Sequence, residues 1–169
     1  MFFRRRASQA PQKRPPIASE LASLVRSHMA GADDDDVRIV TAIAGLLAGV
    51  AYADREYAPA ERDRIREDLG RMNALPDAGV DAICALLDRE IVELGTGNQQ
   101  SYTRDLRELV DTELRREVLE VLVDLAAADG EVSLSETDLL RRTTNALGLS
   151  PDDYTAAQAR HSDRLSILK

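Results

Sequence analysis

Apolar residues recur at spacings of three and four from Ile17 onward, and no stretch alternates apolar and polar residues for long enough to form a sheet. Side chains three and four positions apart share one face of an α-helix, so the pattern predicts an all-α fold. Turn residues divide it into eight expected helices, at residues 17–29, 36–53, 59–73, 77–94, 101–110, 112–128, 134–147 and 151–160. A turn-rich linker is expected between Leu94 and Ser101, near the middle of the chain.

The longest uncharged stretch runs from Ile39 to Ala53. It is shorter than the roughly 18 to 20 residues that a membrane-spanning helix requires. It also contains Gly45 and Gly49, whose missing side chains suit close packing between helices. We therefore interpret this stretch as a helix of the core.

A shift of 75 residues aligns the sequence with itself. It places residues 51–56 on residues 126–131 and Glu61 on Glu136, and five apolar positions upstream follow the same offset. The simplest architecture is a duplicated helix-loop-helix unit, with copies at about 37–94 and 112–160. Neither copy can bury its apolar face alone, so we expect the two to pack together about a pseudo-twofold axis.

Each copy has an acidic loop with an Asp that ends one helix, a Glu two positions later and a Glu that opens the next helix. These candidate metal ligands are Asp54, Glu56 and Glu61 in the first loop, and Asp129, Glu131 and Glu136 in the second. Carboxylates that cluster in this way require protons or cations, and Ca²⁺ prefers oxygen ligands. The spacing is not that of an EF-hand, because positions six and twelve from Asp129 are leucines.

The same residues have an alternative, structural interpretation. Ser133 and Glu136 have the spacing of a capping box, and Gly130 is suited to the turn that ends a helix. In the first copy, Ala58 stands at the capping position and has no side-chain acceptor, which leaves Glu61 with a weaker capping role. Cation binding and helix capping both remain open from the sequence.

The second copy reads Leu-Ala-Ala-Ala-Asp-Gly-Glu-Val-Ser over residues 125–133, followed by Glu136 and by Leu-Gly-Leu over residues 147–149. This pattern resembles the TerB family of tellurite-resistance proteins and the related DjlA N-terminal domain, over residues 37–153. The resemblance implies a compact fold of about seven to nine helices and calcium or another divalent metal bound by the two acidic loops. It also implies tellurite resistance and stress responses through partner proteins, some of them membrane-bound, without catalysis.

The first loop departs from the family pattern at Arg55, where glycine is usual. Arginine adopts a positive φ only at a cost, and its charge lies among carboxylates. Two outcomes are open: the first metal site is weakened, or Arg55 replaces a cation by pairing with a carboxylate.

Composition narrows the function further. The 169 residues predict one domain at positions 17–169, after a disordered basic tail at 1–16. The net charge is -8, and the five basic residues of the tail leave -13 on the remainder, which argues against nucleic-acid binding. The tail lacks the apolar run of a signal peptide, so we expect a cytoplasmic protein. An alternative role for the tail is contact with an anionic membrane or an acidic partner.

One cysteine and two histidines provide neither a disulfide nor a structural zinc site. Cys84 lies in an apolar run and is expected to be buried, His28 is expected to be partly buried on its helix, and His161 is expected near a frayed end. No serine or cysteine is arranged with a histidine for nucleophilic catalysis. We therefore expect no enzymatic activity and no small-molecule substrate, but a protein that acts through protein partners.

Overall fold

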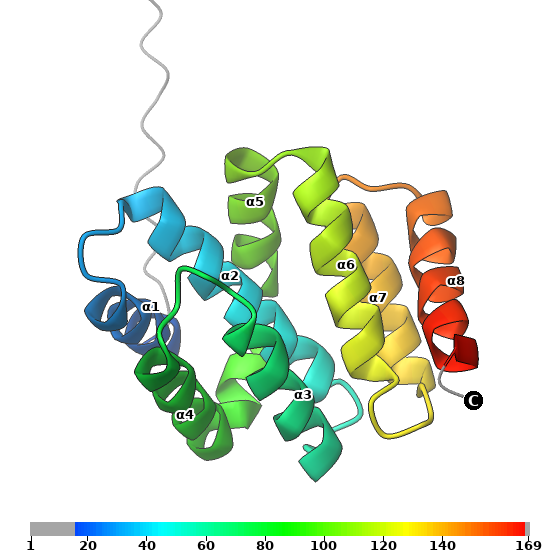
Figure 1. The fold of residues 1–169 in the computed structure, drawn as a ribbon, viewed down its shortest axis with the longest axis horizontal. Coiled ribbons are helices and arrows are strands. Elements are labelled where there is room, and N and C mark those ends of the chain that lie inside the picture. The colour runs from blue at the N-terminus through cyan, green and yellow to red at the C-terminus, as the bar shows by residue number, and fades with distance from the viewer. Residues whose placement is uncertain (1–15, 168–169) are drawn as a thin grey trace, which may run out of the picture.

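The computed structural model describes residues 16–167, and side chains within 17–163. This part of the chain forms helices and no strands (Figure 1). The helices are α1 (Pro16–His28), α2 (Asp34–Ala51), α3 (Pro59–Gly70), α4 (Asp77–Thr96), α5 (Gln99–Leu109), α6 (Thr112–Ala126), α7 (Leu134–Ala146) and α8 (Pro151–Ile167). The predicted all-α class and all eight predicted helices are confirmed. The predicted basic tail at 1–16 lies almost entirely outside the described residues.

Helix α2 is the centre of the fold. It packs against α1 and against each helix from α3 to α7, while α8 packs on α6 and α7. Twelve of its eighteen residues are buried. The helix starts where Asp33 accepts a hydrogen bond from the backbone N–H of Asp36 at 2.8 Å, and the acidic first turn interacts favourably with the helix dipole. The uncharged stretch is therefore a core helix, as the sequence predicted.

Two glycines of α2 allow α5 to approach closely. A Cβ atom on Gly45 would overlap the buried ring of Tyr102, and one on Gly49 would overlap the side chain of Gln99. Gln99 uses this proximity, because its Nε2 donates a hydrogen bond to the carbonyl of Gly45 at 3.0 Å. The small residues thus determine the distance between the two helices.

We predict that Gly45→Ala lowers the free energy of unfolding by about 1–3 kcal/mol, because the added methyl group must displace the Tyr102 ring in a close-packed core. Gly70→Ala is the matched control, since a Cβ atom there meets no other atom within 4 Å. Urea denaturation measures both. Equal stability of the two variants would contradict the packing role of Gly45.

The connection between α4 and α5 is shorter than the six-residue linker predicted from the sequence. Helix α4 continues through Thr96 and α5 starts at Gln99, which leaves Gly97 and Asn98 as the connection. Gly95 stays helical because it packs against α2: its Cβ position lies 2.6 Å from Tyr52 Cβ and 2.9 Å from the Ala48 carbonyl oxygen. Tertiary packing therefore overrides the local turn signal.

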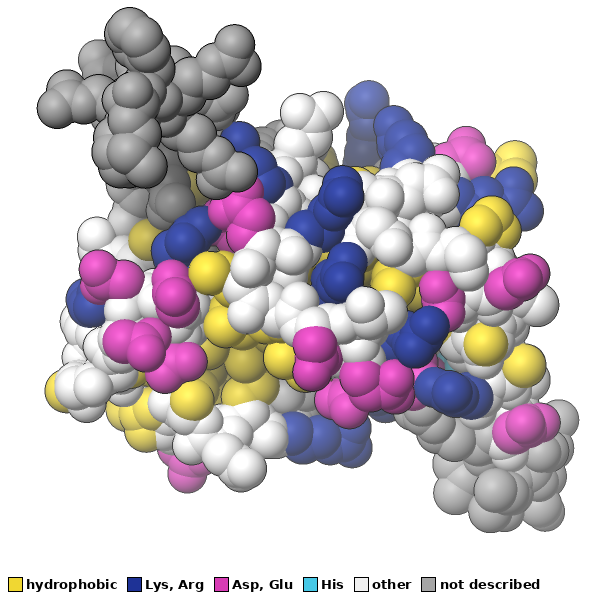
Figure 2. Space-filling view, turned by 90° about the horizontal axis from the view of Figure 1, so that it is seen from above, with side chains coloured by type: hydrophobic (Ala, Val, Ile, Leu, Met, Phe, Trp, Pro, Cys, Tyr) yellow, Lys and Arg dark blue, Asp and Glu magenta, His cyan; other side chains and the backbone are white. Residues whose placement is uncertain are grey.

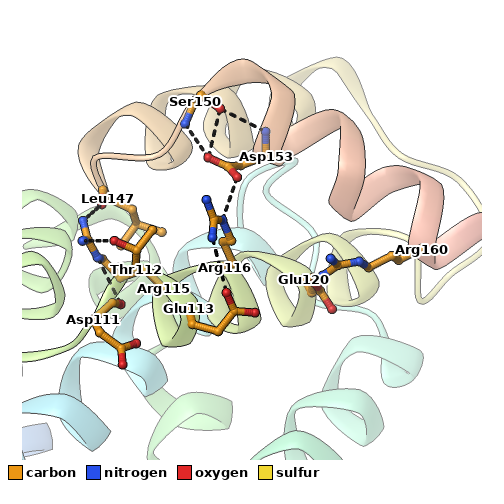
Figure 3. A network of polar contacts seen from close by, with 10 residues as sticks. All are labelled: Asp111, Thr112, Glu113, Arg115, Arg116, Glu120, Leu147, Ser150, Asp153 and Arg160. Atoms are coloured by element: carbon orange, nitrogen blue, oxygen red, sulfur yellow. Dashed lines mark hydrogen bonds and ion pairs between the residues drawn. The ribbon is translucent and has the colours of Figure 1, made fainter.

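A polar network fastens α8 to α6 (Figure 3). Arg116 Nε donates to Asp153 Oδ1 at 2.8 Å, and Asp153 Oδ2 accepts from the Ser150 backbone N–H at 2.8 Å. The Ser150 backbone bond and the Arg116 guanidinium together lower the pKa of Asp153. Further along, Arg160 forms an ion pair with Glu120. The last helix is thus held by charged contacts as well as by its buried residues.

Within the described residues, no helix is long and apolar enough to cross a membrane. On the face seen from above, basic and acidic side chains are interspersed (Figure 2). That face therefore carries no broad region of one charge.

Candidate acidic loop site

The two acidic loops have the same backbone construction. Asp54 Oδ1 accepts a hydrogen bond from the Glu56 N–H at 2.9 Å, and Asp129 Oδ1 accepts one from the Glu131 N–H at 3.1 Å. The preceding turns also match, because the N–H of Arg55 donates to Tyr52 at 3.0 Å and that of Gly130 donates to Ala127 at 3.1 Å. The repeat seen in the sequence is therefore a repeat of local structure at the loops.

The glutamate that opens the next helix caps it in both copies. Glu61 Oε2 accepts from the Ala58 N–H at 2.9 Å, and Glu136 Oε2 accepts from the Ser133 N–H at 2.7 Å. The second copy adds a bond from the Glu136 N–H to Ser133 Oγ at 3.1 Å, which completes its capping box. The weaker capping role expected of Glu61 is a single hydrogen bond: its carboxylate caps a backbone N–H, but Ala58 cannot reciprocate.

Arg55 lies in the left-handed region with φ 67°, at the position where Gly130 has φ 94°. A side chain in this region costs roughly 1 kcal/mol, because its Cβ atom crowds the backbone. Among the described residues, no carboxylate lies within ion-pairing distance of the Arg55 guanidinium. Of the two outcomes that the sequence left open, the pairing of Arg55 within the loop is therefore not observed. The loop retains a strained arginine without such compensation.

We predict that Arg55→Gly raises the free energy of unfolding by about 1 kcal/mol, because glycine adopts the observed φ without strain. Gly130→Ala is the reciprocal change, and it should lower stability by a similar amount because alanine is strained at a positive φ. Open space surrounds the Cβ position, so no clash adds to this effect. Thermal unfolding compares the two. A destabilised Arg55→Gly variant would show that the guanidinium makes a stabilising contact.

The two loops lie side by side at the lower edge of the molecule in Figure 1 and influence each other electrostatically. Burial raises the pKa of Glu61 to about 7, and the negative charges of Asp54, Glu136 and Asp129 add to this effect. Burial also raises the pKa of Glu136, with smaller contributions from Asp54 and Asp129. Carboxylates from two distant segments thus disfavour the ionisation of Glu61 and Glu136.

The raised pKa of Glu61 makes stability depend on pH. Between the usual value of 4.5 and about 7, the folded protein retains a proton that the unfolded chain has lost, so this group's contribution to stability falls as pH rises through that window. Glutamine can keep the capping bond without titrating. We predict that Glu61→Gln, relative to the wild type, gains stability from pH 4.5 to about 7 and keeps that gain above it.

Thermal unfolding in the presence of a chelator tests this dependence, so that no cation compensates the charge. Glu67→Gln is the control, because Glu67 lies exposed on the same helix. Parallel pH profiles for the wild type and Glu61→Gln would contradict the assignment.

The six predicted metal ligands differ in their exposure to solvent. Glu61 and Glu136 are buried, with exposed fractions of 2% and 1%, whereas Glu56, Asp129 and Glu131 are exposed and Asp54 is intermediate. Among the described residues, no three carboxylate, imidazole or thiol groups are placed together so that they could hold a metal ion. One feature is unexplained by capping alone: Glu136 Oε1 is buried and has no hydrogen-bond partner.

A second buried polar cluster, missed in the sequence, lies between α3, α6 and α8. Arg64 donates to Asp68 at 3.1 Å and to Asp124 at 3.3 Å, and His161 Nδ1 lies 2.6 Å from Asp124 Oδ1. Burial raises the pKa of Asp68 against the opposing effect of Arg64. The sequence signal for this cluster was Asp124, a charged residue inside an apolar run. The expectation of a frayed end at His161 is wrong, because α8 continues beyond it.

The expected burial of Cys84 and partial burial of His28 are confirmed. Burial raises the pKa of the Cys84 thiol, as expected for a cysteine that packs as an apolar residue.

Fold and loops together define a class: an all-helical domain with two similarly built acidic loops placed side by side. Residues 40–159 match the family model described as tellurite resistance protein TerB. The chain therefore belongs to the TerB family, as its loop motifs indicated. No curated protein and no solved structure matches the chain.

Proposed function

We propose that this TerB-family protein is a non-catalytic, cytoplasmic component of a tellurite-resistance or stress response, which binds a divalent cation at its acidic loops and acts through protein partners. Calcium is the favoured ion. The net charge of -8 disfavours direct binding of a tellurium oxyanion by these loops, so the link to tellurite is proposed to be indirect.

The observation that carries the proposal is the unpartnered, buried oxygen of Glu136, whose ionisation the charges of Asp54 and Asp129 disfavour. A buried carboxylate oxygen without a partner is costly, and a bound cation would remove that cost. All candidate donors are oxygens, which suits calcium rather than zinc. Asp129, Glu131 and Glu136 are the proposed principal ligands, because the second loop has an unstrained Gly130. Asp54, Glu56 and Glu61 would form the weaker site.

Because no set of three ligands is assembled in the described residues, the proposal requires the exposed Asp129 and Glu131 to move towards Glu136 when the ion binds. Both lie in a loop connection at the surface, where such movement is inexpensive. A cation would supply positive charge between the loops and lower the pKa of the surrounding carboxylates.

A second candidate is a helical interaction module in which the same carboxylates act as caps. The completed capping box at Ser133 and Glu136 and the equivalent bond at Glu61 favour it. In that case partner binding would not require a cation, and the tail at residues 1–16 would supply a basic contact for a membrane or an acidic partner.

Calorimetric titration of calcium into the metal-stripped full chain tests the two candidates, with magnesium as competitor. We expect saturable calcium binding that Glu136→Gln weakens at least tenfold, because glutamine keeps the capping geometry but removes the charged ligand. Asp34→Asn is the matched control, since Asp34 belongs to a different acidic segment at the start of α2.

Absence of binding by folded wild-type protein would favour the capping interpretation. Equal calcium affinity of the wild type and Glu136→Gln would remove Glu136 from the site.

A further inference from the structure

A wide groove of about 1110 Å3 lies next to the first acidic loop. Its walls come from the end of α2, the residues that follow it, the junction of α4 and α5, and one face of α7. The groove therefore lies between segments from both halves of the chain. Its size and openness exceed what a single small molecule requires.

Of the described residues, three charged ones line the groove: Arg55, Asp138 and Arg142. Within the described part of the chain, neither guanidinium has a carboxylate within ion-pairing distance. The lining thus carries a net positive charge in a protein whose overall charge is -8. Two arginines without an ion pair in the described part of the chain are available to an anionic partner.

The backbone conformation of Arg55 independently supports a role for this residue in binding another molecule. Arg55 keeps a left-handed φ of 67° where the second loop has glycine, and it lines the groove. Strained backbone conformations of this kind concentrate at sites of function. A strained arginine with no partner in its own loop is explained if its guanidinium contacts another molecule.

The remaining lining favours a peptide over other polyanions. Val92, with 53% of its surface exposed, and Leu139 supply apolar contacts, while Gln100, Ser101 and Ser135 supply hydrogen-bonding groups. An acidic peptide with interspersed apolar side chains would use both sets. Nucleic acid would need more positive charge and stacking aromatic residues, and Tyr52 is the one aromatic residue among the lining residues described.

We propose that this groove is a docking site for an acidic, partly apolar peptide segment of a partner protein, with Arg55 and Arg142 as its anion-binding residues. The proposal does not depend on cation binding at the loops. It assigns a function to Arg55, which stands in the first loop where the second loop has Gly130.

Fluorescence anisotropy with the full chain, in the presence of a chelator, tests the groove. The probe is a labelled peptide containing glutamate and leucine, compared with a peptide in which every glutamate is glutamine. We expect saturable binding of the acidic peptide, weakened roughly fivefold by Arg55→Gly and by Arg142→Gln. Arg141→Gln is the matched control, because Arg141 is a neighbouring exposed arginine that does not line the groove.

Thermal unfolding of each variant separates loss of binding from loss of folding, and Arg55→Gly is expected to be at least as stable as the wild type. Amide chemical-shift changes upon peptide addition should concentrate at the groove. Three outcomes would overturn the proposal: no preference for the acidic peptide, equal weakening by Arg141→Gln, or displacement of the peptide by a single-stranded oligonucleotide of equal charge.

Discussion

The close packing of α2 against its neighbours is the constraint on which the fold depends. Six helices contact this one helix, and they can do so because glycines and alanines leave room for them. The Gly45 backbone lies against the Tyr102 ring, and the Gly49 backbone lies against Gln99. Since α2 ends at the first acidic loop, this packing also places that loop next to the second one and forms one wall of the groove.

Buried charge is the second organising feature. Glu61, Asp68, Asp124 and Glu136 are all buried. Arg64 compensates two of them, while Glu61 and Glu136 rely on backbone hydrogen bonds and have raised pKa values. A protein does not usually bury acids at this density without compensation by protons or cations. Deprotonation of Glu61 as the pH rises is therefore expected to destabilise the folded protein at the loops.

The two loops share their backbone bonds but differ in one residue, and the difference has a structural meaning. Gly130 relaxes the second loop, whereas Arg55 strains the first and lines the groove. Similar loops can therefore serve different roles, with a cation proposed at the second and an acidic peptide proposed beside the first. Both proposed roles are compatible with the proposal that this TerB-family protein acts through partners.

The helices, the repeated loops and the Ser133 capping box could be predicted from the sequence, because helix periodicity and caps depend on residues within a few positions of one another. The helical conformation of Gly95, the burial of Glu61 and the pairing of His161 with Asp124 could not. Arg64 and Asp124 are 60 positions apart, and no local rule brings them together. Only tertiary packing decides which carboxylates are buried and which guanidinium groups stay exposed to solvent, because desolvation depends on residues that are distant in the sequence.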